Sequence, residues 1–201
     1  MKGSAMLKKL QNEVPSASWI TEDTKPSLLK PCADVILPLT PKDENIMKRM
    51  IDWIKASQDK EFNANNILTE AIGIAAPQIG ENIKMYYILL PIPDKNEKII
   101  YYEHALINPK IIGKSEQIAY LKKGEGCLSV TNHPHEGLVP RNYKINVTGY
   151  DYLKKKKVTL TVRGYEAIVF QHEQDHLEGK LFYHHINKDN PWLNDDKWIM
   201  I

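Results

Sequence analysis

A helical pattern of apolar and polar residues begins soon after position 40. Thr40 precedes Pro41, and acidic residues follow in the first turn, which is typical of a helix start. The apolar positions then share one helical face: Ile46, Met47, Met50, Ile51 and Ile54. The pattern predicts a helix from Pro41 to about Gln58, with its apolar stripe packed into a core.

Shorter apolar runs predict strands in the middle of the chain. Residues 85–90 are typical of a buried strand, and residues 99–112 of one or two further strands, with a turn-rich loop at 91–98 between them. Residues 143–153 and 158–162 carry β-branched and aromatic side chains at alternate positions, which predicts a hairpin. Four lysines would lie at the tip of this hairpin.

The last strong pattern predicts a helix over residues 165–177. Gly179 follows it, at a position that favours a left-handed backbone. The beginning of the chain is rich in Pro, Ser and Lys, so we expect an irregular lead-in over 7–40, and residues 1–6 could be a cloning remnant. We expect a single domain over 1–201, because a chain of 201 residues can bury one substantial core.

Composition narrows the classes of function. Hydrophobic residues make up 42% and charged residues 26%, and the net charge of +2 is too balanced to favour nucleic acid, so we expect no DNA binding. No apolar run approaches the roughly 18 residues that cross a bilayer, and the N-terminus lacks the apolar region of a signal peptide. We therefore expect a cytoplasmic protein without a membrane partner. Cys32 and Cys127 are interpreted as free thiols or metal ligands.

Candidate chemistry is concentrated in the predicted last helix. His172 and His176 are four residues apart, so both imidazoles lie on one helix face and can reach one metal ion. Glu173 lies about 100° around the helix, from where its carboxylate can reach a water on that ion but cannot easily be a third ligand. Two nitrogen ligands, an open position and an adjacent base are typical of a hydrolase.

The third metal ligand has three candidate sources. Phe182 stands where one class of metallopeptidase places a third histidine, and residues 190–201 contain no glutamate, which a second class would use. A cysteine from elsewhere in the chain is the third source, and Cys127 follows Gly126 in a segment that allows close backbone approach. Taken alone, such a cysteine is more often a small buried hydrophobe. With two histidines lacking a partner, we favour Cys127 as the ligand.

Three motifs occur together in the order of one known family. They cover residues 72–78, 125–129 and 171–179. They resemble the peptide deformylase motifs Gly-x-Gly-φ-Ala-Ala-x-Gln, Glu-Gly-Cys-Leu-Ser and Gln-His-Glu-x-Asp-His-Leu-x-Gly. The second and third match completely, whereas Ala71 stands where the family usually has Gly. The chain length and the residues before the third motif resemble the longer, Gram-positive-type (type II) members.

The resemblance implies an α+β fold, in which mixed and antiparallel β-sheets pack around a central metal-binding helix, and a single catalytic domain. It implies removal of the formyl group from the N-terminal formylmethionine of newly made polypeptides, with release of formate. One divalent ion would be held by Cys127, His172 and His176, with Fe²⁺ expected and Zn²⁺, Ni²⁺ or Co²⁺ as alternatives. N-formylmethionyl nascent peptides are the expected partners of a monomeric enzyme.

The resemblance also implies catalytic roles. Glu173 would take a proton from the metal-bound water, which attacks the formyl carbon. The Gln78 side-chain amide and the Leu128 backbone N–H, together with the metal, would hold the developing oxyanion. By matching position, the expected substrate-binding residues are Ile72, Gly73, Glu125, Tyr165, Ile168 and Val169.

Two further expectations concern residues around the site. We expect Asp175 to form an ion pair with Arg141 beside the site. The segment 130–137, which includes His133 and His135, either lines the substrate groove or closes a loop.

Two alternatives also remain. Residues 154–157, the four lysines, form either a solvated turn or a transient contact with ribosomal RNA. The competing functions are a metallopeptidase of another type and a structural metal module, although a structural site would normally have a fourth protein ligand.

Overall fold

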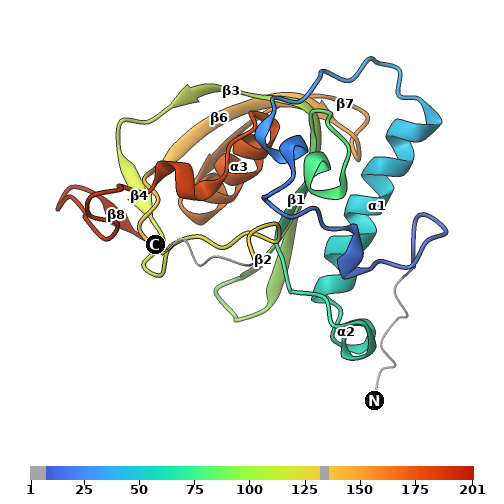
Figure 1. Cartoon of the computed structure of the whole chain (residues 1–201), viewed down its shortest axis with the longest axis horizontal. Coiled ribbons are helices and arrows are strands. Elements are labelled where there is room, and N and C mark those ends of the chain that lie inside the picture. Colours follow the sequence, from blue (N-terminus) through green and yellow to red (C-terminus); the bar gives the residue numbers. More distant parts are fainter. Residues whose placement is uncertain (1–7, 132–135) are drawn as a thin grey trace.

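A five-stranded antiparallel sheet forms the centre of the molecule in the computed structural model, which describes residues 8–131 and 136–201 (Figure 1). The strand order is β1-β2-β3-β6-β7. The strands are β1 (Gly73–Ala75), β2 (Met85–Pro93), β3 (Ile99–Lys114), β6 (Lys144–Asp151) and β7 (Lys156–Arg163). β6 and β7 therefore form the predicted hairpin, with Lys144 paired to Arg163 at its open end.

A smaller sheet contains strands from the second half of the chain. Its order is β5 (Arg141–Asn142), β4 (Ile118–Tyr120) and β8 (Ile199–Met200). β4 pairs antiparallel with β5 and parallel with β8. Antiparallel and mixed sheets with few helices confirm the expected α+β fold.

Helix α1 (Pro41–Gln58) has the predicted bounds. The Thr40 hydroxyl accepts a hydrogen bond from the Asp43 N–H, and the Asp43 carboxylate accepts one from the Thr40 N–H, so the cap is reciprocal. A second helix that the sequence did not reveal, α2 (Lys60–Asn66), follows it directly, with Asp59 as its N-cap. Among the described residues, no helix is long and apolar enough to cross a membrane.

Helix α3 (Tyr165–Leu177) also has the predicted bounds. Gly179 adopts the expected left-handed backbone, with φ +72°. A Cβ at this position would lie 2.7 Å from the backbone carbon of Lys30, so the close approach of the lead-in also requires glycine.

The two longer helices pack on opposite faces of the central sheet, as the alternation of strand residues requires. Ile74 and Tyr87 face the core beside α1, whereas Ala75 and Tyr86 face the core beside α3. In Figure 1, α3 lies inside the curve of β3, β6 and β7, and α1 lies outside it. The central helix of the fold is therefore the one that carries the histidines.

The predicted loop at 91–98 is partly wrong. β2 continues through Pro91 to Pro93, and a turn occupies the remaining positions before a single long β3. Both prolines are tolerated because the Leu89 N–H is the last donor of β2 toward the β1 side, where it bonds the Ile72 carbonyl. Beyond Leu89, no described strand pairs with that edge of β2, so a missing N–H leaves no ladder bond unmade. The predicted hairpin tip is also shifted, since Lys156 and Lys157 already belong to β7.

Candidate active site and metal centre

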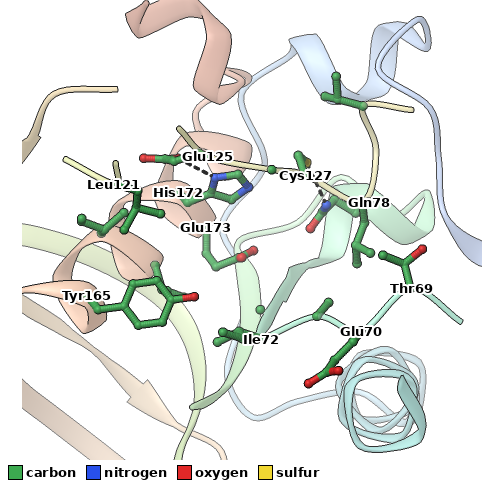
Figure 2. A pocket seen from close by; sticks show the side chains of 17 residues that line it. Thr69, Glu70, Ile72, Gln78, Leu121, Glu125, Cys127, Tyr165, His172 and Glu173 are labelled. Carbon is green, nitrogen blue, oxygen red and sulfur yellow. Dashed lines mark hydrogen bonds and ion pairs between the residues drawn. The ribbon is translucent and has the colours of Figure 1, made fainter. Parts of the chain in front are cut away.

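The three candidate metal ligands lie together. Sγ of Cys127 is 3.4 Å from Nε2 of His176, and the rings of His172 and His176 are 5.1 Å apart. One possible ligand atom from each residue lies within 4.8 Å of the other two. Segments separated by 45 positions in the sequence thus present one sulfur and two nitrogens to a common point. Figure 2 draws two of these residues, Cys127 and His172.

The charges at this point favour a metal ion. Burial alone would raise the pKa of the Cys127 thiol, but the adjacent His176 and His172 lower it to about 5. Cys127 is therefore a thiolate at neutral pH, which is the form that binds metals. A thiolate with two imidazoles is a donor set for Fe, Zn, Ni or Co and unsuited to Mg²⁺ or Ca²⁺.

Glu125 fixes the orientation of His172. Its Oε2 accepts a hydrogen bond from Nδ1 of His172 at 2.8 Å, so Nε2 of that ring is left for the metal. Arg141 holds both carboxylate oxygens of Glu125, at 2.8 and 2.9 Å. Burial opposes ionisation of Glu125, but Arg141 lowers its pKa to about 2. The residue lines the cavity as expected, and it also braces a ligand.

The expected ion pair between Arg141 and Asp175 is confirmed. Nη1 of Arg141 lies 2.5 Å from Oδ2 of Asp175, and both side chains are buried. The same oxygen accepts a hydrogen bond from Nε2 of His185 at 2.8 Å. This role of His185 could not be predicted, because the residue belongs to a short 3-10 helix, Phe182–His185, outside the three motifs.

Glu173 lies beside the candidate ligands and is almost fully buried. Burial raises the pKa of its carboxyl to about 7, which suits a group that exchanges protons near neutral pH. Its Oε2 has no hydrogen-bond partner within the described parts of the chain. Its Oε1 occupies the space in which a side chain at Gly73 would begin, since a Cβ there would be 2.3 Å away.

Gln78 approaches the same point from the opposite side of the cavity (Figure 2). Its Oε1 accepts a hydrogen bond from the Ala75 N–H at 2.9 Å, which fixes which end of the amide faces inward. Its Nε2 lies 3.5 Å from Sγ of Cys127 and 3.3 Å from Oγ of Ser129. Leu128 lines the cavity next to Cys127. One neutral donor, the Gln78 amide nitrogen, thus adjoins the candidate metal centre, and Leu128 borders the same cavity.

A cavity of about 430 Å³ opens on these groups. All six positions expected to bind substrate line it: Ile72, Gly73, Glu125, Tyr165, Ile168 and Val169. Tyr165 and Leu121 lie at one side of the cavity, and Thr69 and Glu70 at the other (Figure 2). The sequence did not single out Leu121, Thr69 or Glu70, because all three lie outside the motifs.

The structure describes some of the residues whose role the sequence left open. Ala71 lines the cavity, and its carbonyl accepts a hydrogen bond from Gln58 at 2.8 Å. Val130 also lines the cavity, but His133 and His135 lie outside the described residues. At the hairpin tip, Lys154 pairs with Asp151 at 2.8 Å, and Lys155 lies 4.0 Å from the ring centroid of Tyr152. Half of the lysine run is therefore engaged within the chain.

The lead-in segment forms backbone hydrogen bonds with all three motifs. The Thr21 N–H donates to the Gln78 carbonyl at 2.7 Å, and the Asp23 N–H donates to the Ser129 carbonyl at 2.8 Å. Further along, the Cys32 N–H donates to the Leu177 carbonyl at 2.9 Å. These backbone bonds align the segments that carry the amide, the thiolate and the histidines.

Comparison with known proteins agrees with this geometry. The family model described as polypeptide deformylase matches residues 17–192. The chain is 44% identical to a peptide deformylase of Pediococcus pentosaceus over 182 residues, covering 90% of this chain and 96% of the relative. It is 40% identical to a peptide deformylase of Mycoplasma genitalium, covering 93% of each chain.

Solved structures show the same likeness. A crystal structure of peptide deformylase from Ehrlichia chaffeensis superimposes with a TM-score of 0.68 at 26% identity, covering 88% of this chain and 90% of that one. A probable peptide deformylase from the Synechococcus phage S-SSM7 superimposes with a TM-score of 0.65 at 29% identity, covering 83% of this chain and 98% of that one. The likeness expected from the three motifs is confirmed, and the chain belongs to the peptide deformylase family of hydrolases.

Proposed function

We propose that this protein removes the formyl group from N-formylmethionyl nascent peptides, with one divalent metal ion at the Cys127 site. The family supports removal of a formyl group from nascent peptides. The observation that carries the proposal is the convergence of one thiolate and two imidazoles beside a buried glutamate and an open cavity. Fe²⁺ is the proposed metal, with Zn²⁺, Ni²⁺ or Co²⁺ as substitutes that suit the same donors.

The residues at this site suit a divalent metal ion. Cys127, His172 and His176 would hold the ion, and within the described residues no fourth Cys, His, Asp or Glu joins them. An ion there would polarise the formyl carbonyl and lower the pKa of a water molecule. Glu125 and Arg141 would keep the His172 ring in place, because they fix its Nδ1–H.

Glu173 would move the protons of the reaction. Its carboxylate would take a proton from the water that attacks the formyl carbon. As the bond between that carbon and the peptide nitrogen breaks, the same carboxyl would give a proton to the nitrogen. The products are formate and a free amino terminus. The raised pKa of Glu173, about 7, supports both steps at neutral pH.

Gln78 and Leu128 would stabilise the oxyanion that forms on the formyl oxygen. Loss of one such donor commonly lowers kcat by a factor of about 10²–10³. The hydrogen bond between the Gln78 Oε1 and the Ala75 N–H supports this role, because it turns the amide NH₂ toward the centre. The walls contributed by Ile72, Ile168 and Val169 suit an unbranched apolar side chain such as methionine.

The cellular setting is a further part of the proposal. We infer a cytoplasmic monomer that meets its substrate as nascent peptides emerge from the ribosome. The exposed Lys156 and Lys157, at the start of β7, would provide the contact with ribosomal RNA. Gel filtration and salt-dependent sedimentation with ribosomes would test the two statements separately.

Formate release is the direct test. The wild-type protein, prepared under anaerobic conditions with Fe²⁺ or Ni²⁺, should release formate from a formyl-Met peptide and leave the unformylated peptide intact. Cleavage of the unformylated peptide would favour a metallopeptidase. Metal binding without formate release would favour a structural metal module.

Two variants divide the site into its parts. Glu173→Ala should keep the metal and lose turnover by about three orders of magnitude, because the proton acceptor is gone. Cys127→Ser should lose metal affinity, because a hydroxyl is a poor substitute for a thiolate. Metal analysis and formate release should be measured for both variants. Near-normal activity of Glu173→Ala would contradict the assignment of Glu173 as the base. Full metal occupancy of Cys127→Ser would contradict the assignment of Cys127 as a metal ligand.

A further inference from the structure

Strand β2 carries two adjacent tyrosines that point to opposite faces of the central sheet. Tyr86 and Tyr87 are both fully buried. Tyr87 packs in the core beside α1, and its hydroxyl donates a hydrogen bond to Glu103 at 2.7 Å. Tyr86 packs in the core beside α3, and within the described chain its hydroxyl has no hydrogen-bond partner. A fully buried phenol without a partner is unfavourable and calls for an explanation.

The Tyr86 side chain lies in the layer that contains the catalytic glutamate. Its ring packs edge-on against Phe170, with centroids 5.9 Å apart. Phe170 and Glu173 are three positions apart on α3 and therefore share a face of that helix. Across the sheet, Tyr86 pairs with Ala75, two positions from the Gly73 that underlies the Glu173 carboxylate.

Tyr86 and Glu173 are also linked by electrostatics and by complementary hydrogen-bonding groups. Burial raises the pKa of Tyr86, and the negative charge of Glu173 raises it further, so the two groups interact. Among the residues that the structure describes, Oε2 of Glu173 is a buried acceptor without a partner, and the Tyr86 hydroxyl is a buried donor without a partner. The other oxygen, Oε1, is the one that lies against Gly73.

We propose that Tyr86 is a positioning residue for Glu173, whose hydroxyl donates a hydrogen bond to Oε2 when substrate occupies the cavity. This inference rests on the proposed function of Glu173 as the group that moves protons. Hydrogen bonds in catalytic sites are often long in the free enzyme and tighten in the substrate complex. The bond would hold the carboxylate in one rotamer, with Oε1 directed at the attacking water. Its effect should therefore appear in kcat and leave KM unchanged.

The substitution Tyr86→Phe tests this role because it removes one oxygen atom and keeps the ring. We expect kcat for formate release from a formyl-Met peptide to fall about tenfold, the factor expected for a hydrogen bond to a charged group. KM should stay within about twofold, metal content should be unchanged, and the melting temperature should be unchanged or higher, since an unpaired buried hydroxyl is removed.

The neighbouring substitution Tyr87→Phe is a matched control. It removes the same atom from the same strand, but that hydroxyl is paired with Glu103 on the far face of the sheet. This variant should lower the melting temperature and leave kcat unchanged. The two tyrosines are therefore expected to respond in opposite ways, one in turnover and the other in stability.

Several results would overturn the inference. Wild-type kcat in Tyr86→Phe would show that the hydroxyl does not position Glu173. Poor folding or metal loss in that variant would give the hydroxyl a structural role instead. An inactive wild-type protein would refute the proposed function, and this inference with it, whereas an active wild type with an equally active Tyr86→Phe refutes the inference alone.

Discussion

Gly73 leaves the space that the Glu173 carboxylate occupies, so Gly73→Ala should displace this proposed base without unfolding the protein. A Cβ at this position would lie 2.3 Å from Oε1 of Glu173 and 2.8 Å from its Cδ. An ordinary contact begins near 3.4 Å, so the carboxylate must move by about 1.1 Å. A misplacement of about 1 Å in a catalytic group can reduce the rate about a hundredfold.

Stability should respond differently to the same change. The backbone of Gly73 is not in the left-handed region, so alanine is allowed there. Replacing such a glycine stabilises a protein by about 0.4–1 kcal/mol through the unfolded chain. This gain offsets the cost of moving a flexible carboxylate. We therefore expect kcat/KM to fall about a hundredfold while the melting temperature changes little.

The assay is formate release measured beside thermal unfolding. Gly113→Ala is the matched control, because Gly113 also lies in a strand and its Cβ would meet the end of a polar side chain, Nδ2 of Asn146, at 3.1 Å. That control lies far along β3 from the site motifs and should keep its activity. If Gly73→Ala kept kcat/KM within threefold of wild type, the contact between position 73 and the carboxylate would not constrain catalysis, and the reasoning would be refuted.

The remaining predictions concern the oxyanion and the ion-pair network. Gln78→Leu should lower kcat about a hundredfold with little change in KM; steady-state kinetics check this, and a change confined to KM would assign Gln78 to substrate binding. Asp175→Asn should destabilise the protein by about 3 kcal/mol at neutral pH, because buried Arg141 loses a charged partner. Burial opposes ionisation, but His185 and Arg141 hold the pKa of Asp175 below its usual value, so this stability is present above about pH 4 and disappears as the pH falls below it. Urea unfolding across pH measures the difference, and an equal difference at pH 2 and pH 7 would contradict the explanation.

Local signals explain which elements could be predicted from the sequence. The capping Thr40 and the apolar spacing after it define α1, and the pattern up to Gly179 defines α3, because both depend on neighbouring residues. α2 has seven residues and no long apolar stripe, so it was missed. The strand extension through Pro91 and Pro93 depends on a free sheet edge, which is a tertiary property.

The same distinction applies to the site. Cys127 and the two histidines could be predicted as a metal site because the His172–His176 pair requires a third ligand. All three residues also belong to the recognised motifs. The brace from Arg141 through Glu125 to His172 combines three elements distant in sequence, and its geometry emerges when the sheet and α3 pack together. His185 and Tyr86 belong to no motif, and their positions depend on tertiary packing alone.

The lead-in has a consequence for any shortened version of the chain. A fragment starting at α1 would retain every motif residue, yet it would lose the bonds from Thr21, Asp23 and Cys32 to the backbones of Gln78, Ser129 and Leu177. Those carbonyls would turn to solvent, and the three motif segments would no longer share a common anchor. In this enzyme the irregular lead-in holds these segments in place, so completeness of the motifs is not sufficient for a working centre.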